Sequence, residues 1–158
     1  MLNIYFAGAI RGGREDGQLY GQLISYLKTF GTVLTEHVGD DGLLLEEKSL
    51  TEAEIFRRDM QWLGAADLVI AEVSTPSLGV GYEIGLAQTL GKPILCLYRP
   101  GEKRRLSAMI AGNPALRVGC YSHLAEAERL LAGWLRQFPG KGPALSGERS
   151  ISPLPPFG

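Results

Sequence analysis

Short apolar runs alternate along this chain with longer segments in which apolar residues recur every three to four positions. The apolar runs cover residues 2–7, 32–35, 68–72, 94–98 and 116–121. Continuous apolar runs of this length are typical of strands buried on both faces, and the segments between them have the period of amphipathic helices. Strands that alternate with helices build a parallel sheet covered on both sides. The pattern therefore predicts a three-layer α/β domain with a five-stranded parallel sheet.

Local signals predict where several helices begin and end. The first helix is expected to end at Gly31, because glycine is favoured just after a helix. Thr51 and Glu54 have the spacing of a capping box, which predicts a second helix from this point to about Gly64. The last helix is predicted between residues 124 and 138, where apolar residues keep helical spacing until a Pro-Gly pair.

The length of 158 residues favours a single domain, which we place at residues 1–140. Residues 141–158 are rich in Gly, Pro and Ser without any period, so we expect a disordered tail there. Residues 38–50 are polar and acidic and contain glycine, which favours a mobile surface loop.

Composition and charge narrow the classes of partner. The net charge of −1 predicts no surface for a nucleic acid polymer or an anionic membrane. No apolar run approaches the roughly 18 residues of a membrane span, and the N-terminus has no secretory signal pattern. We therefore expect a cytoplasmic protein, also nuclear in a eukaryote. Cys96 and Cys120 lie in apolar runs without another ligand nearby, so they are interpreted as reduced core residues, with no metal site.

The segment from Ser74 to Glu83 carries the strongest chemical signal. It follows the apolar run 68–72 and is predicted to form a strand, a loop of phosphate size and a helix with Glu83 in its first turn. Glycines at 79 and 81 would let a phosphate approach the unpaired N–H groups at the helix start. A phosphate anchor beside an ionised carboxylate suits attack on, or stabilisation of, a sugar carbon that carries a leaving group.

Other polar residues are predicted at the same sheet edge, where ligands bind in open parallel sheets. Residues 8–14 form a Gly-rich turn in which Arg11 could meet a phosphate, although the turn matches neither the dinucleotide fingerprint nor the P-loop. His37 follows the second strand, where it could equally cap the strand end. Asp59 falls on the apolar face of the second helix, and an unpaired buried carboxylate there would be costly, which favours a site residue. Arg99 is interpreted as a solvated loop charge, as are Arg104 and Arg105.

Five segments together carry a family resemblance. They are Tyr5–Asp16, Phe30–Val38, Arg58–Leu63, Pro76–Glu83 and Leu106–Ile110. In this order they resemble the 2'-deoxynucleoside 5'-phosphate N-hydrolase family, within the nucleoside 2-deoxyribosyltransferase superfamily. The resemblance covers about residues 2–138. It implies a Rossmann-like or flavodoxin-like fold and hydrolysis of the N-glycosidic bond of 2'-deoxynucleoside 5'-monophosphates, with purines such as dGMP favoured and no cofactor or metal.

The resemblance also implies roles for individual residues. Glu83 is similar to the nucleophile that attacks C1' and forms a deoxyribosyl-enzyme intermediate. Asp59 is similar to its acid–base partner, and Tyr5 to the residue that positions the nucleophile through a hydrogen bond. The residues implied to bind substrate are Gly8, Ala9, Ile10, Arg11, Gly12, His37, Ser77, Gly79 and Ser107.

Within that set, the implied phosphate ligands are Arg11, Ser77, Gly79 and Ser107, and the residues implied to line the sugar and base pocket are Ile10 and His37. Ser107 is similar to a residue supplied by a neighbouring subunit, which implies a homodimer with composite sites. Ala9 stands where the family commonly has a hydroxyl residue, so the backbone N–H of Ala9 would have to serve instead.

Three alternatives remain open on the sequence. The first is a deoxyribosyltransferase, in which a second base captures the intermediate. The second is an N-hydrolase of ribonucleotides or of modified pyrimidine nucleotides, such as hydroxymethyl-CMP or hydroxymethyl-dUMP. The third is a non-catalytic nucleotide-binding module, against which the two carboxylates argue, since a pure anion binder gains nothing from extra negative charge.

Overall fold

The structure is a computed structural model that describes residues 1–10, 16–39, 49–101 and 105–138. Its strands are β1 (Leu2–Ala7), β2 (Gly31–Val33), β3 (Leu68–Glu72), β4 (Ile94–Tyr98) and β5 (Arg117–Cys120). Its helices are α1 (Gly17–Leu27), the 3-10 helix η1 (Glu36–Gly39), α3 (Glu52–Ala65), α4 (Leu78–Thr89), α5 (Ala108–Ala111) and α6 (Leu124–Leu135).

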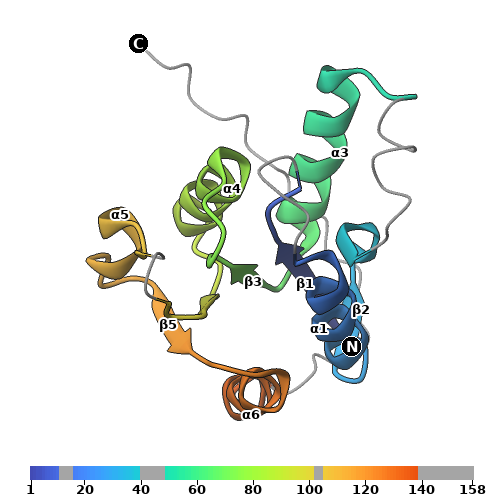
Figure 1. The fold of residues 1–158 in the computed structure, drawn as a ribbon. Coiled ribbons are helices and arrows are strands. Elements are labelled where there is room, and N and C mark those ends of the chain that lie inside the picture. The colour runs from blue at the N-terminus through green and yellow to red at the C-terminus, as the bar shows by residue number, and fades with distance from the viewer. Residues whose placement is uncertain (11–15, 40–48, 102–104, 139–158) are drawn as a thin grey trace.

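The five strands form one parallel sheet in the order β2-β1-β3-β4-β5. Figure 1 shows α1 and α6 on one face of this sheet and α3 and α4 on the other. The arrangement confirms the predicted three-layer α/β fold, and the strand order is that of flavodoxin-like proteins. Because the chain leaves β1 first toward β2 and later returns to β3 on its other side, the order reverses between β1 and β3.

Alternating side chains of the central strands supply two separate cores. In β1, Ile4 and Phe6 belong to the core under α1 and α6, whereas Tyr5 and Ala7 belong to the core under α3 and α4. Tyr5 pairs in register with Val69 of β3, and both are buried. Burial on both faces explains why these strands are continuous apolar runs in the sequence.

Three of the predicted strands, at residues 2–7, 68–72 and 94–98, have the bounds that the apolar runs indicate. The predicted strand 32–35 ends two residues early. The reason is Thr35, whose Oγ1 accepts a hydrogen bond from Phe6 N at 2.8 Å and donates one to Phe6 O at 2.7 Å. At this position the Thr35 side chain therefore takes the place of the backbone hydrogen bonds between β1 and β2.

The prediction that Gly31 ends the first helix is wrong. Helix α1 ends at Leu27, and Gly31 is the first residue of β2. A Cβ at Gly31 would lie 2.2 Å from the carbonyl oxygen of Leu2. The glycine is therefore needed for the close approach of two strands rather than for a helix cap.

The prediction that both cysteines lie in the core is correct for Cys96 only. Cys96 is buried, whereas Cys120 is exposed. Cys120 lies in the edge strand β5, where the sheet has a neighbour on one side only. The predicted loop at residues 38–50 is also wrong at its start, because Val38 is buried in η1. Residues 40–48 and the predicted tail 141–158 lie outside the described residues.

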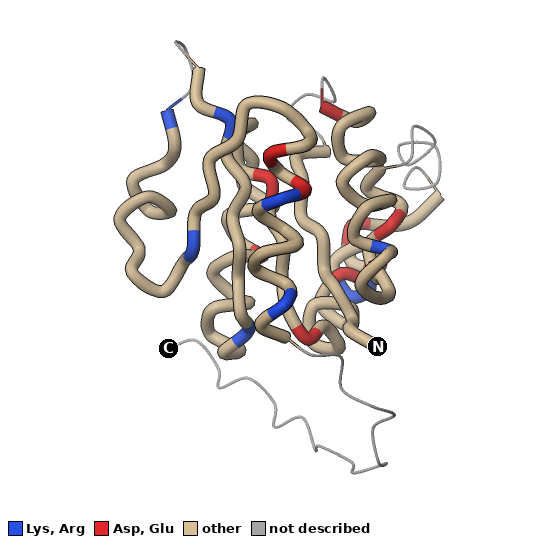
Figure 2. The backbone as a smooth tube through the Cα atoms, turned by 90° about the horizontal axis from the view of Figure 1, so that it is seen from below, with Lys and Arg blue, Asp and Glu red and all other residues tan. Residues whose placement is uncertain are grey.

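The polar surface is mixed. In Figure 2, Lys and Arg positions are spread over several elements of the described backbone, with Asp and Glu between them. None of the helices in the described ranges has the length and apolar character that crossing a membrane requires.

Candidate active site

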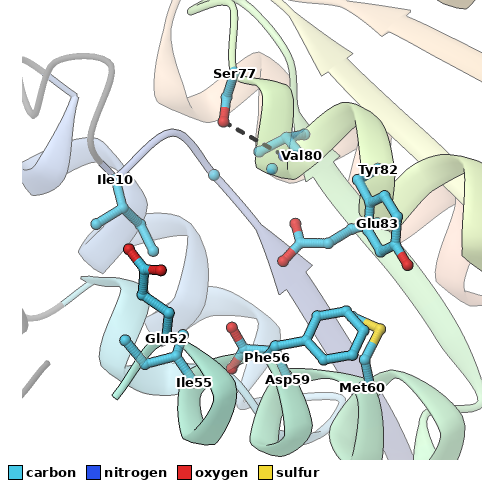
Figure 3. A pocket seen from close by; sticks show the side chains of 12 residues that line it. Ile10, Glu52, Ile55, Phe56, Asp59, Met60, Ser77, Val80, Tyr82 and Glu83 are labelled. Carbon is cyan, nitrogen blue, oxygen red and sulfur yellow. Dashed lines mark hydrogen bonds between the residues drawn. The ribbon is translucent and has the colours of Figure 1, made fainter. Parts of the chain in front are cut away.

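A cavity of about 380 Å³ opens beyond the carboxyl ends of β1 and β3, between α3 and α4. This is the point where the strand order reverses, which is the usual ligand position in such sheets. The volume is within the range of small-molecule sites. The cavity is lined by Gly8, Ile10, Glu52, Ile55, Phe56, Asp59, Met60, Ser77, Gly79, Val80, Tyr82 and Glu83 (Figure 3).

Glu83 extends from α4 into this cavity (Figure 3). It lies in the second turn of α4, not in the first as predicted, because Ser77 caps the helix and α4 already begins at Leu78. Tyr5, from the carboxyl half of β1, donates a hydrogen bond from its hydroxyl to Glu83 Oε1 at 2.7 Å. The predicted contact between these two residues is therefore present in the structure.

The surroundings of Glu83 shift its acidity. Burial raises the pKa of Glu83 to about 7. The hydrogen bond from Tyr5 opposes this rise, and the negative charge of Asp59 adds to it. Burial and then the charge of Glu83 raise the pKa of Tyr5 well above its usual value, so Tyr5 stays a hydrogen-bond donor at neutral pH. A carboxyl group that titrates near neutral pH is suited to nucleophilic or acid–base work.

Asp59 extends from α3 toward the same space as Glu83 (Figure 3). The prediction of an unpaired buried carboxylate needs correction: the Asp59 side chain is 19% exposed, and its Oδ1 is 2.9 Å from Nε of Arg58. Arg58 also lies over the Trp62 ring, 4.9 Å from its centroid. The role of Arg58 was missed, although its position beside Asp59 and four residues before Trp62 was a usable signal.

His37 lies next to the cavity rather than in its lining. It belongs to η1, and its Nε2 is 3.2 Å from Nη2 of Arg58. Its ring packs on Trp62, with centroids 5.1 Å apart. Arg58 thus lies between His37 and Asp59 and contacts both side chains.

The start of α4 forms one wall of the cavity. Ser77 Oγ accepts a hydrogen bond from Val80 N at 3.3 Å, as the dashed line in Figure 3 marks. Gly79 and Gly81 lie inside the first turns of α4 and not in a loop, which corrects the predicted loop of phosphate size. The first amides of a helix have no partner within it, so those of Leu78 and Gly79 remain available for an anion.

The turn after β1 forms the opposite wall. Gly8 and Ile10 line the cavity, whereas Ala9 is only 1% exposed and does not line it, so the predicted substrate contact of Ala9 is not present in this structure. Arg11 and Gly12 lie outside the described residues.

Ser107 does not line this cavity. It caps the short helix α5, accepting from Met109 N at 3.3 Å, and lines a second hollow between α4 and α5. Ser77 lines both hollows, so the two adjoin.

Apolar and acidic residues on α3 and α4 complete the cavity and were missed from sequence. They are Glu52, Ile55, Phe56, Met60, Val80 and Tyr82. Those on α3 have the helical spacing of Asp59, which was the available signal. Phe56 and Tyr82 are about half exposed, and their ring centroids are 6.2 Å apart. Within the described ranges, no three His, Cys, Asp or Glu side chains lie close enough to hold a metal ion.

Comparison with known families decides the identity of the fold. Residues 4–125 match the family described as nucleoside 2-deoxyribosyltransferase. The chain belongs to this family. The resemblance predicted from its motifs is thereby confirmed.

Relatives within the family are similar over most of the chain. The protein named 5-hydroxymethyl-dUMP N-hydrolase in Mus musculus is 47% identical over 153 residues, which are 94% of this chain and 88% of the relative. The protein of that name in Danio rerio is 51% identical over 135 residues, 82% of this chain and 93% of the relative. A Trichoplax adhaerens protein named "Putative 2'-deoxynucleoside 5'-phosphate N-hydrolase 1" is 53% identical over 110 residues, 70% of this chain and 75% of the relative.

A solved structure of the CMP N-glycosidase BcmB of Clostridium botulinum shares the fold. Its TM-score is 0.60 at 22% identity, over 84% of this chain and 98% of that chain. The sequence predicts a hydrolase of N-glycosyl bonds. The names of BcmB and of the relatives above belong to the same enzyme class, which supports this prediction.

Proposed function

We propose that this member of the nucleoside 2-deoxyribosyltransferase family hydrolyses the N-glycosidic bond of 2'-deoxynucleoside 5'-monophosphates, releasing a free base and 2-deoxyribose 5-phosphate. The observation that carries the proposal is the pair of carboxylates, Glu83 and Asp59, directed into one cavity beside a helix N-terminus. A displacement at a sugar carbon through a covalent intermediate uses one carboxyl group as the nucleophile and a second for proton transfer.

In the proposed reaction, Glu83 is the nucleophile. Its carboxylate oxygen bonds to C1' while the bond from C1' to the base nitrogen breaks, and Asp59 gives a proton to the departing base. Water then attacks C1', the ester bond to Glu83 breaks, and the proton of the water passes to Asp59. Positive charge develops readily at C1', because a 2-deoxyribose has no electron-withdrawing 2'-hydroxyl, and the carboxylate of Glu83 stabilises this charge.

Tyr5 has a defined part in this scheme. Its hydroxyl bond to Glu83 at 2.7 Å holds one carboxylate oxygen, which leaves the other free to face C1'. The same bond favours the ionised form of Glu83 against the effect of burial.

The 5'-phosphate is proposed to bind between the start of α4 and the turn after β1. The free amides of α4 and the side chain of Ser77 lie across the cavity from Gly8 and Ile10. Arg11, which follows Ile10 in the sequence, would supply the positive charge. Phosphate binding far from C1' provides energy that orients the sugar for attack.

The choice of base is proposed from the relatives and from the cavity. Relatives from mouse and zebrafish carry the name 5-hydroxymethyl-dUMP N-hydrolase, so this modified pyrimidine nucleotide is the first substrate to test. Purine nucleotides such as dGMP, which the resemblance favours, are the second. Ile10 and the apolar residues of α3 that line the cavity could pack against a pyrimidine or a purine ring.

A homodimer is proposed to complete the site. Leu78 and Met109 are 96% and 80% exposed, and both line the hollow between α4 and α5, as does Ser107. Large apolar side chains exposed together favour an interface. A second copy docked here would cover them and bring its Ser107 toward the phosphate position beside Ser77.

Chromatography of free base and sugar phosphate tests the proposal. Purified protein is incubated with 5-hydroxymethyl-dUMP, dGMP, GMP and deoxyguanosine, and with dGMP plus free adenine. Release of base from the deoxynucleotides alone is expected, and formation of an adenine deoxynucleotide would reveal transferase activity through a captured intermediate. Turnover of GMP instead would contradict the deoxyribose preference.

Substitution of the nucleophile completes the test. Glu83→Gln is expected to abolish turnover while binding of a deoxynucleotide persists. Glu128→Gln, on α6 at the opposite face of the sheet, is the matched control and should keep full activity. Activity in Glu83→Gln would remove the proposed nucleophile, and silence of the wild type on every nucleotide would favour a binding module.

A further inference from the structure

A buried polar cluster lies at the same end of the sheet as the cavity but on the opposite face, and the proposed chemistry does not use it. Its centre is Glu72, the last residue of β3, which is fully buried. Alternation along β3 places Glu72 on the side of Leu68 and Ile70, in the core under α1 and α6. We call Asp16, Glu72, Ser74, Arg99 and Tyr121 the Glu72 cluster.

Hydrogen bonds within the cluster join three strands. The hydroxyls of Ser74 and Tyr121 both donate to Glu72 Oε1, the latter at 3.0 Å, and Ser74 N donates to Oε2 at 3.2 Å. Ser74 Oγ also accepts from Arg99 N at 2.7 Å. Residues that follow β3, β4 and β5 are thus tied to one carboxylate.

An ion pair extends these ties to the start of α1. Arg99 was predicted to be a solvated charge, but its side chain is 25% exposed and its Nη2 is 2.5 Å from Oδ1 of Asp16. Asp16 immediately precedes α1. Thr75 Oγ1, two residues before Ser77, donates to Oδ2 of the same carboxylate at 3.1 Å.

Asp16 therefore joins the start of α1 to the segment from Thr75 to Gly79, which forms one wall of the candidate phosphate site. The other wall, at Gly8 and Ile10, rests on α1 through Tyr20, because a Cβ at Gly8 would lie 2.9 Å from the Tyr20 ring. Tyr20 N also donates to the carbonyl oxygen of Asp16 at 2.9 Å. Both walls are thus linked to Asp16, one directly and one through Tyr20.

Stability alone is a weak reason for such a cluster. A buried ion pair often contributes no more than apolar side chains of the same volume would, while it does fix the geometry of the groups that it joins. Burial raises the pKa of Glu72, and the hydrogen bonds from Ser74 and Tyr121 oppose this rise. Keeping this carboxyl group ionised in the core therefore costs free energy of folding. A requirement for fixed geometry at the phosphate site would account for that cost.

We infer that the Glu72 cluster is a positioning device for the 5'-phosphate: together with Tyr20 it holds residues 8–10 and the start of α4 at the separation at which their amides meet one phosphate. This inference rests on the proposed function for the identity of the substrate. Its residues touch no reacting atom, so they are positioning residues and not catalytic residues.

Two variants test the inference. Thr75→Val removes one hydrogen bond to Asp16 without changing the side-chain volume, and Arg99→Met removes the ion pair while keeping the length of the side chain. Lys92→Met is the matched control. Its Nζ donates to the carbonyls of Gly64 and Ala66, at the other end of the sheet.

The readouts separate a positioning role from a general loss of stability. The dissociation constant for inorganic phosphate is measured by NMR titration, and KM and kcat are measured for 5-hydroxymethyl-dUMP or dGMP. Loss of one hydrogen bond is expected to weaken phosphate binding about threefold or more in Thr75→Val, and loss of the ion pair is expected to weaken it further. KM should rise by a similar factor, while Lys92→Met leaves both values unchanged.

Unchanged phosphate affinity in a folded Thr75→Val protein would overturn the inference, as would equal weakening in Lys92→Met. If Arg99→Met does not fold, Thr75→Val decides alone. The proposed function fails separately: a wild type that binds phosphate, loses it in the cluster variants and cleaves no nucleotide would support the positioning role while refuting the hydrolase.

Discussion

The hydrogen bond from Tyr5 to Glu83 should set the pH at which the enzyme becomes active. The pKa of Glu83 is raised to about 7, mainly by burial, and the Tyr5 hydroxyl opposes this rise. Glu83 must be ionised to act as the proposed nucleophile, so activity should fall as the pH drops through about 7. Tyr5→Phe removes the donor and keeps the ring in the core, so the ionised form of Glu83 loses a hydrogen bond at 2.7 Å.

The size of the effect follows from the strength of that bond. A hydrogen bond to a charged group contributes about 1.5–3 kcal/mol, and one pKa unit corresponds to about 1.4 kcal/mol. The acid limb of kcat/KM, which reports the free enzyme, should therefore move upward by about one to two pH units. It is measured on the best substrate between pH 5 and 10.

Tyr26→Phe provides the control, since Tyr26 packs on Phe30 under the opposite face of the sheet. Its profile should match the wild type. An acid limb of Tyr5→Phe that stays in place or moves to lower pH would refute this account of Glu83.

Three further predictions concern stability and are checked by denaturant unfolding. The pKa of Glu83 in the folded state is raised from 4.5 to about 7, so its carboxyl group destabilises the fold increasingly as the pH rises through that range. Glu83→Gln should therefore be more stable than the wild type by about 3 kcal/mol at pH 8. This difference should disappear by about pH 4. Gly31→Ala should destabilise the fold by at least about 2 kcal/mol, because the new Cβ would meet the Leu2 carbonyl at 2.2 Å, and a neutral result would show that β2 can shift. Thr51→Ala should cost about 1 kcal/mol, since it removes the capping box at the start of α3, whereas an unchanged midpoint would mean that the helix end frays already.

Much of the fold could be predicted because the central strands are buried on both faces. Such strands appear in the sequence as continuous apolar runs, and β1, β3 and β4 have the bounds that these runs indicate. The edges of the sheet were less predictable. At β2 the side chain of Thr35 takes over the pairing, and at β5 burial is partial, so neither end is marked by hydrophobicity.

The cavity was predictable in its outline for a different reason. Residues that follow parallel strands meet at one sheet edge, so the turn after β1, His37 and the segment that leads to Glu83 could be placed together from sequence. The contact of Tyr5 with Glu83 was implied only by the family resemblance. The local sequence pattern could not predict contacts between side chains that are far apart in the sequence. The contacts of Arg58 with His37 and of Arg99 with Asp16 join residues more than twenty positions apart. The neighbours of Arg58 in the sequence, Asp59 and Trp62, indicate local contacts but not His37, and nothing near Arg99 in the sequence distinguishes it from a solvated arginine.

The unequal burial of the two cysteines makes this protein easy to label. Cys96 is fully buried, and burial raises the pKa of its thiol to about 12, so it stays protonated and out of reach of reagents. Cys120 is exposed at the edge of the sheet, next to Tyr121. A maleimide dye or a fluorinated tag should therefore attach at one position of the natural sequence, and it would report on the sheet edge beside the Glu72 cluster without any engineered cysteine.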